Sequence, residues 1–139
     1  MDYNEAYVMA LRLLNVRFLS EGELRKKLRA KEASPDICDA VLEKLKGERF
    51  IDDERLAAEV FRLYARKNQY GRRYIVNRLR LRGLPVPDET EPLDELATAA
   101  SLIKKRFSSG GADPRKIARF LQYRGFSPGV ISEIIGHVE

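Results

Sequence analysis

The chain has 139 residues, 44% apolar and 34% charged, so it can bury a core and wholesale disorder is excluded. A single cysteine and a single histidine exclude an internal disulfide, a structural zinc site and most thiol- or histidine-dependent catalysis within one chain. We find no apolar run of membrane-spanning length and no signal-like N-terminus, so we expect a cytoplasmic protein without membrane contact.

The positive charge is concentrated in the middle of the chain. The formal net charge is +5, and residues 51–83 carry nine basic and four acidic side chains. Residues 1–50 are nearly balanced, and residues 84–139 have a net charge of −1. A positive region of this kind favours a polyanion or an acidic protein surface as partner.

The first fifty residues have apolar positions three and four apart, which predicts three helices. Ser20, with Glu23 three residues later, has capping-box spacing and predicts the start of the second helix. Ser34-Pro35 predicts the start of the third, and Gly47 its end. The predicted buried stripes are Tyr7, Ala10, Leu11, Leu14 and Phe18; Leu24 and Leu28; and Ile37, Ala40, Val41 and Leu45.

The rest of the chain predicts five more helices. Acidic residues 52–54 mark the start of the fourth, Gly71 separates it from the fifth, and Gly83 ends the fifth. Asp113-Pro114 and Ser127-Pro128 open the last two helices. The predicted stripes are Ala57, Val60, Phe61 and Tyr64; Ile75 and Leu79; Leu96, Ala99, Ala100, Ile103 and Phe107; Ile117 and Leu121; and Val130, Ile131, Ile134, Ile135 and Val138.

These segments form a degenerate repeat. Residues 28–35, 79–85 and 121–128 align, and a cap-type residue (Ser20, Gly71 or Asp113) stands eight positions before each aligned leucine. The pattern predicts an all-α chain of tandem, helix-turn-helix-like three-helix repeats in an elongated, curved array, with repeats at 1–49, 50–92 and 93–139. The second repeat is nine residues short, so we expect its third helix to be shortened or lost in the linker 85–92, which is rich in proline and acid.

Residues 66–82 hold seven basic side chains and no acidic one. At 100° per residue, Arg73 and Arg80 share one flank of the fifth helix, and Arg78 and Arg82 share the other. A solvated helix with its charged stems over its own apolar face is the simpler interpretation. We favour contact with phosphate or acidic protein, because the missing acids should leave these arginines unpaired. The candidates are Arg66, Lys67, Arg72, Arg73, Arg78, Arg80 and Arg82, with Arg25, Lys26, Arg29, Lys116 and Arg119 on matching helices.

Catalysis is not expected. Asp52-Asp53 is a candidate carboxylate pair for acid–base or metal chemistry, but adjacent carboxylates at a helix start are far more often caps. The serines are caps as well, and Cys38 is expected to pack in the core. We therefore expect no catalytic residue, no metal, no cofactor and no small-molecule substrate.

The chain resembles the RecX family of recombination regulators at residues 50–57, in the glycine–arginine segment 71–84, and at residues 124–127. Residues 10–14 and 23–28 also look like that family's first repeat. The resemblance implies a protein that lodges in the groove of the RecA filament on single-stranded DNA. No self-associating heptad is visible in the sequence, so we expect a monomer. It also implies inhibition of filament growth, ATP hydrolysis, strand exchange and repressor coproteolysis. The family's basic concave face would fall on Arg72, Arg73, Arg78, Arg80 and Arg82.

Two other functions stay open at this point. Three short helices with a basic member also suit a direct, mostly non-specific DNA-binding module, for which Gln69, Asn77 and Gln122 are the candidate base readers. A helical adaptor for some other acidic protein is the third possibility. Weak binding to single-stranded DNA that fades with salt is compatible with the first two functions.

Overall fold

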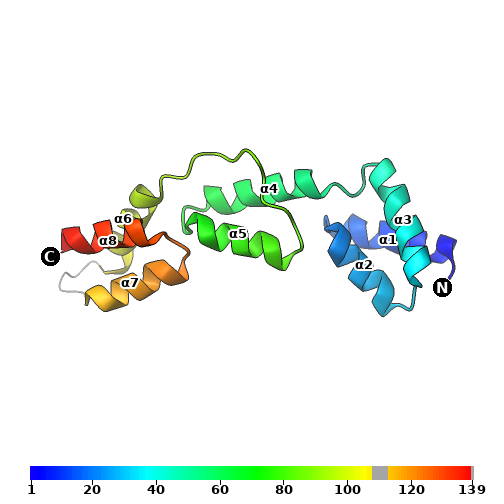
Figure 1. The fold of residues 1–139 in the computed structure, drawn as a ribbon, viewed down its shortest axis with the longest axis horizontal. Coiled ribbons are helices and arrows are strands. Elements are labelled where there is room, and N and C mark those ends of the chain that lie inside the picture. The colour runs from blue at the N-terminus through cyan, green and yellow to red at the C-terminus, as the bar shows by residue number, and fades with distance from the viewer. Residues whose placement is uncertain (108–112, 139) are drawn as a thin grey trace. The chain divides into compact units, whose positions relative to one another are not determined.

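The structure, a computed structural model, describes residues 1–107 and 113–138, and all of their regular secondary structure is α-helical. The all-α prediction is therefore confirmed. The helices are α1 (Tyr3–Val16), α2 (Glu21–Ala30), α3 (Pro35–Gly47), α4 (Asp53–Arg66), α5 (Arg72–Leu81), α6 (Glu95–Arg106), α7 (Pro114–Tyr123) and α8 (Pro128–Val138) (Figure 1).

The chain divides into two compact units. The first contains Met1–Ala58 and Arg80–Val86, and the second contains Glu59–Leu79 and Pro87–Glu139. The division passes through α4 and α5, so the start of α4 and the end of α5 belong to the first unit. The three repeat boundaries expected from the sequence stay a prediction.

In the first unit, α1, α2 and α3 pack together around a buried core, as Figure 1 shows in blue to cyan. The predicted caps are present. The Glu23 amide donates to Ser20 Oγ (3.1 Å), and the Ser20 amide donates to Glu23 Oε1 (2.9 Å), which completes a capping box. The Ile37 amide donates to Ser34 Oγ (3.2 Å). Leu24 and Leu28 of α2 are fully buried, as expected.

Some predicted stripe positions are wrong. Phe18 is 68% exposed and Leu19 is buried instead, because α1 ends at Val16 and the extended Arg17 breaks the helical phase. In α3, Ala40 is exposed and the buried face runs through Cys38, Val41, Leu42 and Leu45. That face is rotated because α3 packs against both α1 and α2. Leu96 and Ala100 of α6 are likewise exposed, and the side chain of Val138 lies outside the described residues.

In the second unit, α6, α7 and α8 enclose a separate core (Figure 1, yellow to red). Its buried members are Ala99, Ile103, Ile117, Leu121, Phe126 and Ile134. The Arg115 amide donates to Asp113 Oδ1 (2.9 Å) and the Val130 amide donates to Ser127 Oγ (3.3 Å), so both predicted caps are confirmed. Each three-helix bundle thus has its own core and its own capped helices.

The backbone supports the predicted alignment of the repeats. The three aligned leucines, at positions 28, 79 and 121, are fully buried. Four residues after each of them the chain takes a positive φ: 70° at Glu32, 70° at Gly83 and 85° at Gly125. A residue of this conformation commonly ends a helix. The second helix of each repeat therefore ends in the same turn.

Two of these turns pack against the start of the second helix of the preceding repeat. The turn after α5 meets the start of α2, and the turn after α7 meets the start of α5. We call these the inter-repeat contacts. In the first unit, Ser20 Oγ at the start of α2 donates to the Arg82 carbonyl (2.6 Å). In the second unit, the Gly71 amide donates to the Arg124 carbonyl (2.8 Å) and the Arg73 amide to the Gly125 carbonyl (3.2 Å). Helix starts have unsatisfied amides, and in the second contact carbonyls of a turn satisfy two of them at the start of α5.

No helix forms between Leu81 and Glu95, which confirms the predicted loss of the third helix of the second repeat. Part of this segment is held by the second unit. Glu91 Oε1 lies 3.8 Å from Arg62 Nε and 3.7 Å from Arg66 Nη2, and the Arg72 guanidinium donates to Thr90 Oγ1 (3.4 Å). The loop therefore supplies an acid that the basic stretch itself lacks.

Candidate functional site

The helix α5 carries two exposed arginines that pair with no acid among the described residues. Arg73 and Arg80 project into solvent, and neither forms an ion pair within the described part of the chain. Arg78 is also exposed and is hydrogen-bonded to the Tyr64 side chain, which raises the pKa of the guanidinium further. All three guanidinium groups are therefore accessible to an external anion.

Arg82 is different, because it is used inside the first unit. Its Nη2 lies 3.0 Å from Glu23 Oε1 and donates to the Phe18 carbonyl (2.9 Å), while its Nε lies 3.2 Å from Glu23 Oε2. Only 24% of the Arg82 side chain is exposed. The expectation that these arginines are left unpaired is therefore wrong for Arg82, whose partner stands 59 residues earlier.

Several other candidates are also engaged. Arg66 pairs with Glu91, and Arg25 of α2 pairs with Asp39 (2.7 Å). Lys67 lies over the Tyr64 ring (5.0 Å to its centroid) and Arg72 over the Phe61 ring (5.6 Å). Lys26 and Arg29 of α2, and Lys116 and Arg119 of α7, are exposed and form no ion pair with a described residue. The basic set is therefore partly structural and partly free to bind.

A tyrosine cluster beside these cations was not predicted. The Tyr70 and Tyr74 rings are stacked with centroids 4.0 Å apart, and both meet Tyr64 edge-on (5.8 and 6.0 Å). Arg124, from the turn after α7, lies over Tyr70 (5.6 Å). Burial and the neighbouring Tyr70 raise the pKa of Tyr74. Arg124 links this cluster to the second inter-repeat contact, because its own carbonyl accepts from the Gly71 amide. Tyr70 precedes α5, which begins at Arg72, so no helical spacing in the sequence indicated the stacking of Tyr70 on Tyr74.

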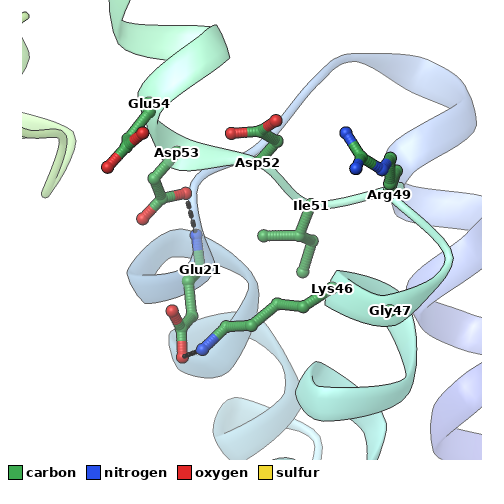
Figure 2. Close-up of a pocket in the computed structure, with 8 residues that line it drawn as sticks. All are labelled: Glu21, Lys46, Gly47, Arg49, Ile51, Asp52, Asp53 and Glu54. Carbon is green, nitrogen blue, oxygen red and sulfur yellow. Dashed lines mark hydrogen bonds and ion pairs between the residues drawn. The ribbon is translucent and has the colours of Figure 1, made fainter.

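The paired aspartates lie in an acidic cleft of the first unit (Figure 2). Asp52 Oδ1 accepts from the Arg55 amide (3.1 Å), whereas Asp53 Oδ1 accepts from the Glu21 amide at the start of α2 (2.9 Å). Lys46 Nζ pairs with the Glu21 carboxylate (2.8 Å). Burial raises the pKa of Asp53, although the Glu21 amide opposes this. Both aspartates therefore act as helix caps, Asp52 for α4 and Asp53 for α2.

Replacing Asp52 by alanine is expected to lower the free energy of unfolding by about 1 kcal/mol, the usual cost of losing an N-cap. Urea unfolding followed by circular dichroism measures this. The matched control is Glu54→Ala, which removes an exposed acid from the same cleft and should cost less than about 0.5 kcal/mol. Equal losses in the two variants, or a magnesium-dependent rise in melting temperature that only Asp52→Ala abolishes, would contradict the capping role.

Comparison with known proteins shows which family the chain belongs to. A regulatory protein RecX of Leptothrix cholodnii is 34% identical over 134 residues, covering 91% of this chain and 84% of that protein. This chain belongs to the RecX family. Family models for the first and third three-helix domains of RecX match residues 6–45 and 94–135.

Other RecX proteins show the same relationship. The regulatory protein RecX of Geobacillus thermodenitrificans is 32% identical, and this chain spans 56% of its length. The crystal structure of RecX from Lactobacillus salivarius superposes with a TM-score of 0.79 over 98% of this chain and 96% of that one, at 21% identity. The chain therefore has the RecX fold.

Membership of the RecX family gives the chain a regulatory role, since its relatives are named regulatory proteins. Within the described residues, no helix is long and apolar enough to cross a bilayer. The two domains matched by family models flank the middle repeat, where the free arginines of α5 lie.

Proposed function

We propose that this RecX-family chain binds the RecA filament assembled on single-stranded DNA, lodges in its groove, and inhibits or modulates filament growth, ATP hydrolysis, strand exchange and coprotease activity. The observation that carries the proposal, beside family membership, is the pair of exposed arginines on α5, Arg73 and Arg80, which have no internal partner among the described residues. A protein filament on single-stranded DNA contains phosphates, and guanidinium groups bind phosphates and carboxylates alike.

The chemistry of arginine suits such a surface. A guanidinium presents fixed donors that match carboxylate and phosphate oxygens equally well. Arg73 and Arg80 are seven residues apart on one helix, so they share a side of α5 about 10 Å apart along its axis. Regulation of this kind requires binding alone, because a protein that occupies the groove can restrain filament growth without catalysing a reaction.

The test is the DNA-dependent ATPase of RecA, titrated with this protein on single-stranded DNA. We expect inhibition at substoichiometric protein, and Arg73→Ala/Arg80→Ala should need at least about tenfold more protein for half inhibition, since each lost charged hydrogen bond contributes about 1.5 kcal/mol or more. The charge-matched control is Arg12→Ala/Lys44→Ala, which removes two exposed cations outside the candidate set and should inhibit like the wild type.

An inert wild-type protein at saturating concentration would overturn this proposal. If that inert protein still shifts DNA in a gel, the direct DNA-binding module takes its place. A preference for one duplex that persists in high salt would then indicate base reading, whereas binding that fades with salt would indicate phosphate contact only.

A further inference from the structure

The second unit contains a shallow basic and aromatic cleft that the inhibition of a protein filament does not require. It lies where the end of α6 meets one side of α7. Its lining residues are Arg106, Phe107, Lys116, Arg119, Phe120 and Tyr123. Among these lining residues none is acidic, so the cleft is a local concentration of positive charge beside aromatic rings.

The rings of the cleft differ in what they offer. Phe120 is already occupied, with the Arg106 guanidinium 5.3 Å and the Arg124 guanidinium 5.1 Å from its centroid, and with Phe107 packed edge-on at 5.9 Å. Tyr123 is 83% exposed and makes no ring contact with a described residue. Phe120 is therefore a wall of the cleft, and Tyr123 is the ring with a free face.

The free ring and the cations share one side of the helix. Lys116, Arg119 and Tyr123 follow each other at three- and four-residue spacing, which places them along one stripe of α7. The buried residues Ile117 and Leu121 occupy the opposite stripe. This stripe therefore offers a ligand one exposed ring face beside two cations that form no ion pair with a described residue.

We propose that this cleft binds single-stranded nucleic acid directly, with one base stacked on Tyr123 and the adjoining phosphates held by Lys116 and Arg119. Aromatic rings beside cations are the usual means of binding single strands without sequence preference. A duplex fits less well, because its bases are already stacked on each other. An acidic peptide would use the cations but leave the free face of Tyr123 without a partner. The proposal goes beyond the proposed function because it requires no RecA.

The experiment measures fluorescence anisotropy of a labelled oligothymidylate with the full chain and without RecA. The comparison strand is an abasic oligonucleotide of the same length, which keeps the phosphates and lacks the bases. We expect the wild type to bind the oligothymidylate about tenfold more tightly than the abasic strand. Tyr123→Ala should lose that preference, because stacking of one base on an aromatic side chain accounts for a factor of this size or more. Tyr123→Phe should keep it.

The salt dependence separates the role of the cations from that of the ring. Lys116→Ala/Arg119→Ala should weaken binding of both strands and reduce the slope of log affinity against log salt by about 0.7 for each phosphate that is no longer neutralised. Tyr123→Ala should leave that slope unchanged. The control is Arg12→Ala/Lys44→Ala in the first unit, which should bind like the wild type. Melting curves confirm that each variant is folded, and the exposure of all three cleft side chains makes unfolding unexpected.

Three outcomes would overturn the proposal. Equal affinity for the oligothymidylate and the abasic strand would reduce the cleft to a phosphate site. Displacement of the strand by poly-glutamate at an equal concentration of charge would assign it to acidic protein. A Tyr123→Phe variant as weak as Tyr123→Ala would show that the hydroxyl, and not the ring, binds the strand. Because RecA is absent, none of these results bears on filament inhibition, which the Arg73/Arg80 titration tests separately.

Discussion

Replacing Gly125 by alanine is expected to lower the free energy of unfolding by about 3 kcal/mol or more, the largest effect that we anticipate for a single methyl group. Gly125 has a φ of 85°, which an L-residue adopts only at a cost. Its added Cβ would also lie 2.2 Å from the Tyr74 nitrogen and 2.5 Å from the Tyr74 Cβ. Backbone cannot swing aside, so the second inter-repeat contact would have to open, which would break the hydrogen bonds from the Gly71 and Arg73 amides.

Two other glycines provide matched controls. Gly83 has a φ of 70°, but a Cβ there would meet nothing closer than 3.8 Å, so Gly83→Ala measures the backbone cost alone, about 1–2 kcal/mol. Gly129 lies in α8 with nothing within 4 Å of an added Cβ, so Gly129→Ala should be neutral or stabilise by up to about 1 kcal/mol. Urea unfolding compares all three. Equal losses for Gly125→Ala and Gly83→Ala would show that the close approach of Gly125 to Tyr74 does not add to the loss of stability.

The second large effect is expected at the ion pair between Arg82 and Glu23. Arg82→Met should lower the free energy of unfolding by about 1–2 kcal/mol, because Glu23 and the Phe18 carbonyl lose their donor in a half-buried place. Arg25→Met, which breaks the more exposed pair with Asp39, should cost about 0.5 kcal/mol or less. The single variant Glu23→Gln and the double variant Glu23→Gln/Arg82→Met complete a thermodynamic cycle, which isolates the energy of the pair.

The same pair has a pH dependence of known sign. Burial acts to raise the pKa of Glu23, but hydrogen bonds from Arg82 and the Ser20 amide outweigh it and leave the pKa below its ordinary value of 4.5. A carboxyl with a lowered pKa contributes stability above its unfolded pKa and loses it as the pH falls through the folded pKa. The stability difference between wild type and Arg82→Met should therefore be constant above about pH 5.5 and shrink towards pH 3. A difference that grows on acidification would contradict this assignment.

The elements of the fold were predictable because their signals are local. Ser20, Ser34, Asp113 and Ser127 each cap a helix in the structure as the sequence indicates. The missing helix of the second repeat was predictable from length alone, since a segment that is nine residues shorter lacks the residues to form that helix. Single stripe positions such as Phe18 failed because a helix end changes the phase of the pattern, and periodicity does not show where helices end.

For the candidate site, the sequence predicted which segment is rich in basic residues, but not which of these residues are paired. The sequence shows seven cations in residues 66–82, but the acids that pair with two of them stand elsewhere in the chain. Glu23 reaches Arg82 across 59 positions, and Glu91 reaches Arg66 from the loop that replaces a helix. Long-range pairing of this kind follows from packing between segments, so no local pattern separates the structural arginines from Arg73 and Arg80.

The inter-repeat contacts also constrain how such a chain can evolve. Each contact joins unlike surfaces, a turn on one repeat and a helix start on the other, so it has a direction, as a heterologous interface does. The turn after α2 has Glu32 where the two packed turns have glycine, and Glu32 is exposed. A side chain at the position of Gly125 would meet the backbone of Tyr74. Copying the first repeat into the third position would therefore require this residue to change as well, whereas the turn at Gly83 has room for a side chain. The residue that each turn accepts thus depends on the position of its repeat in the chain.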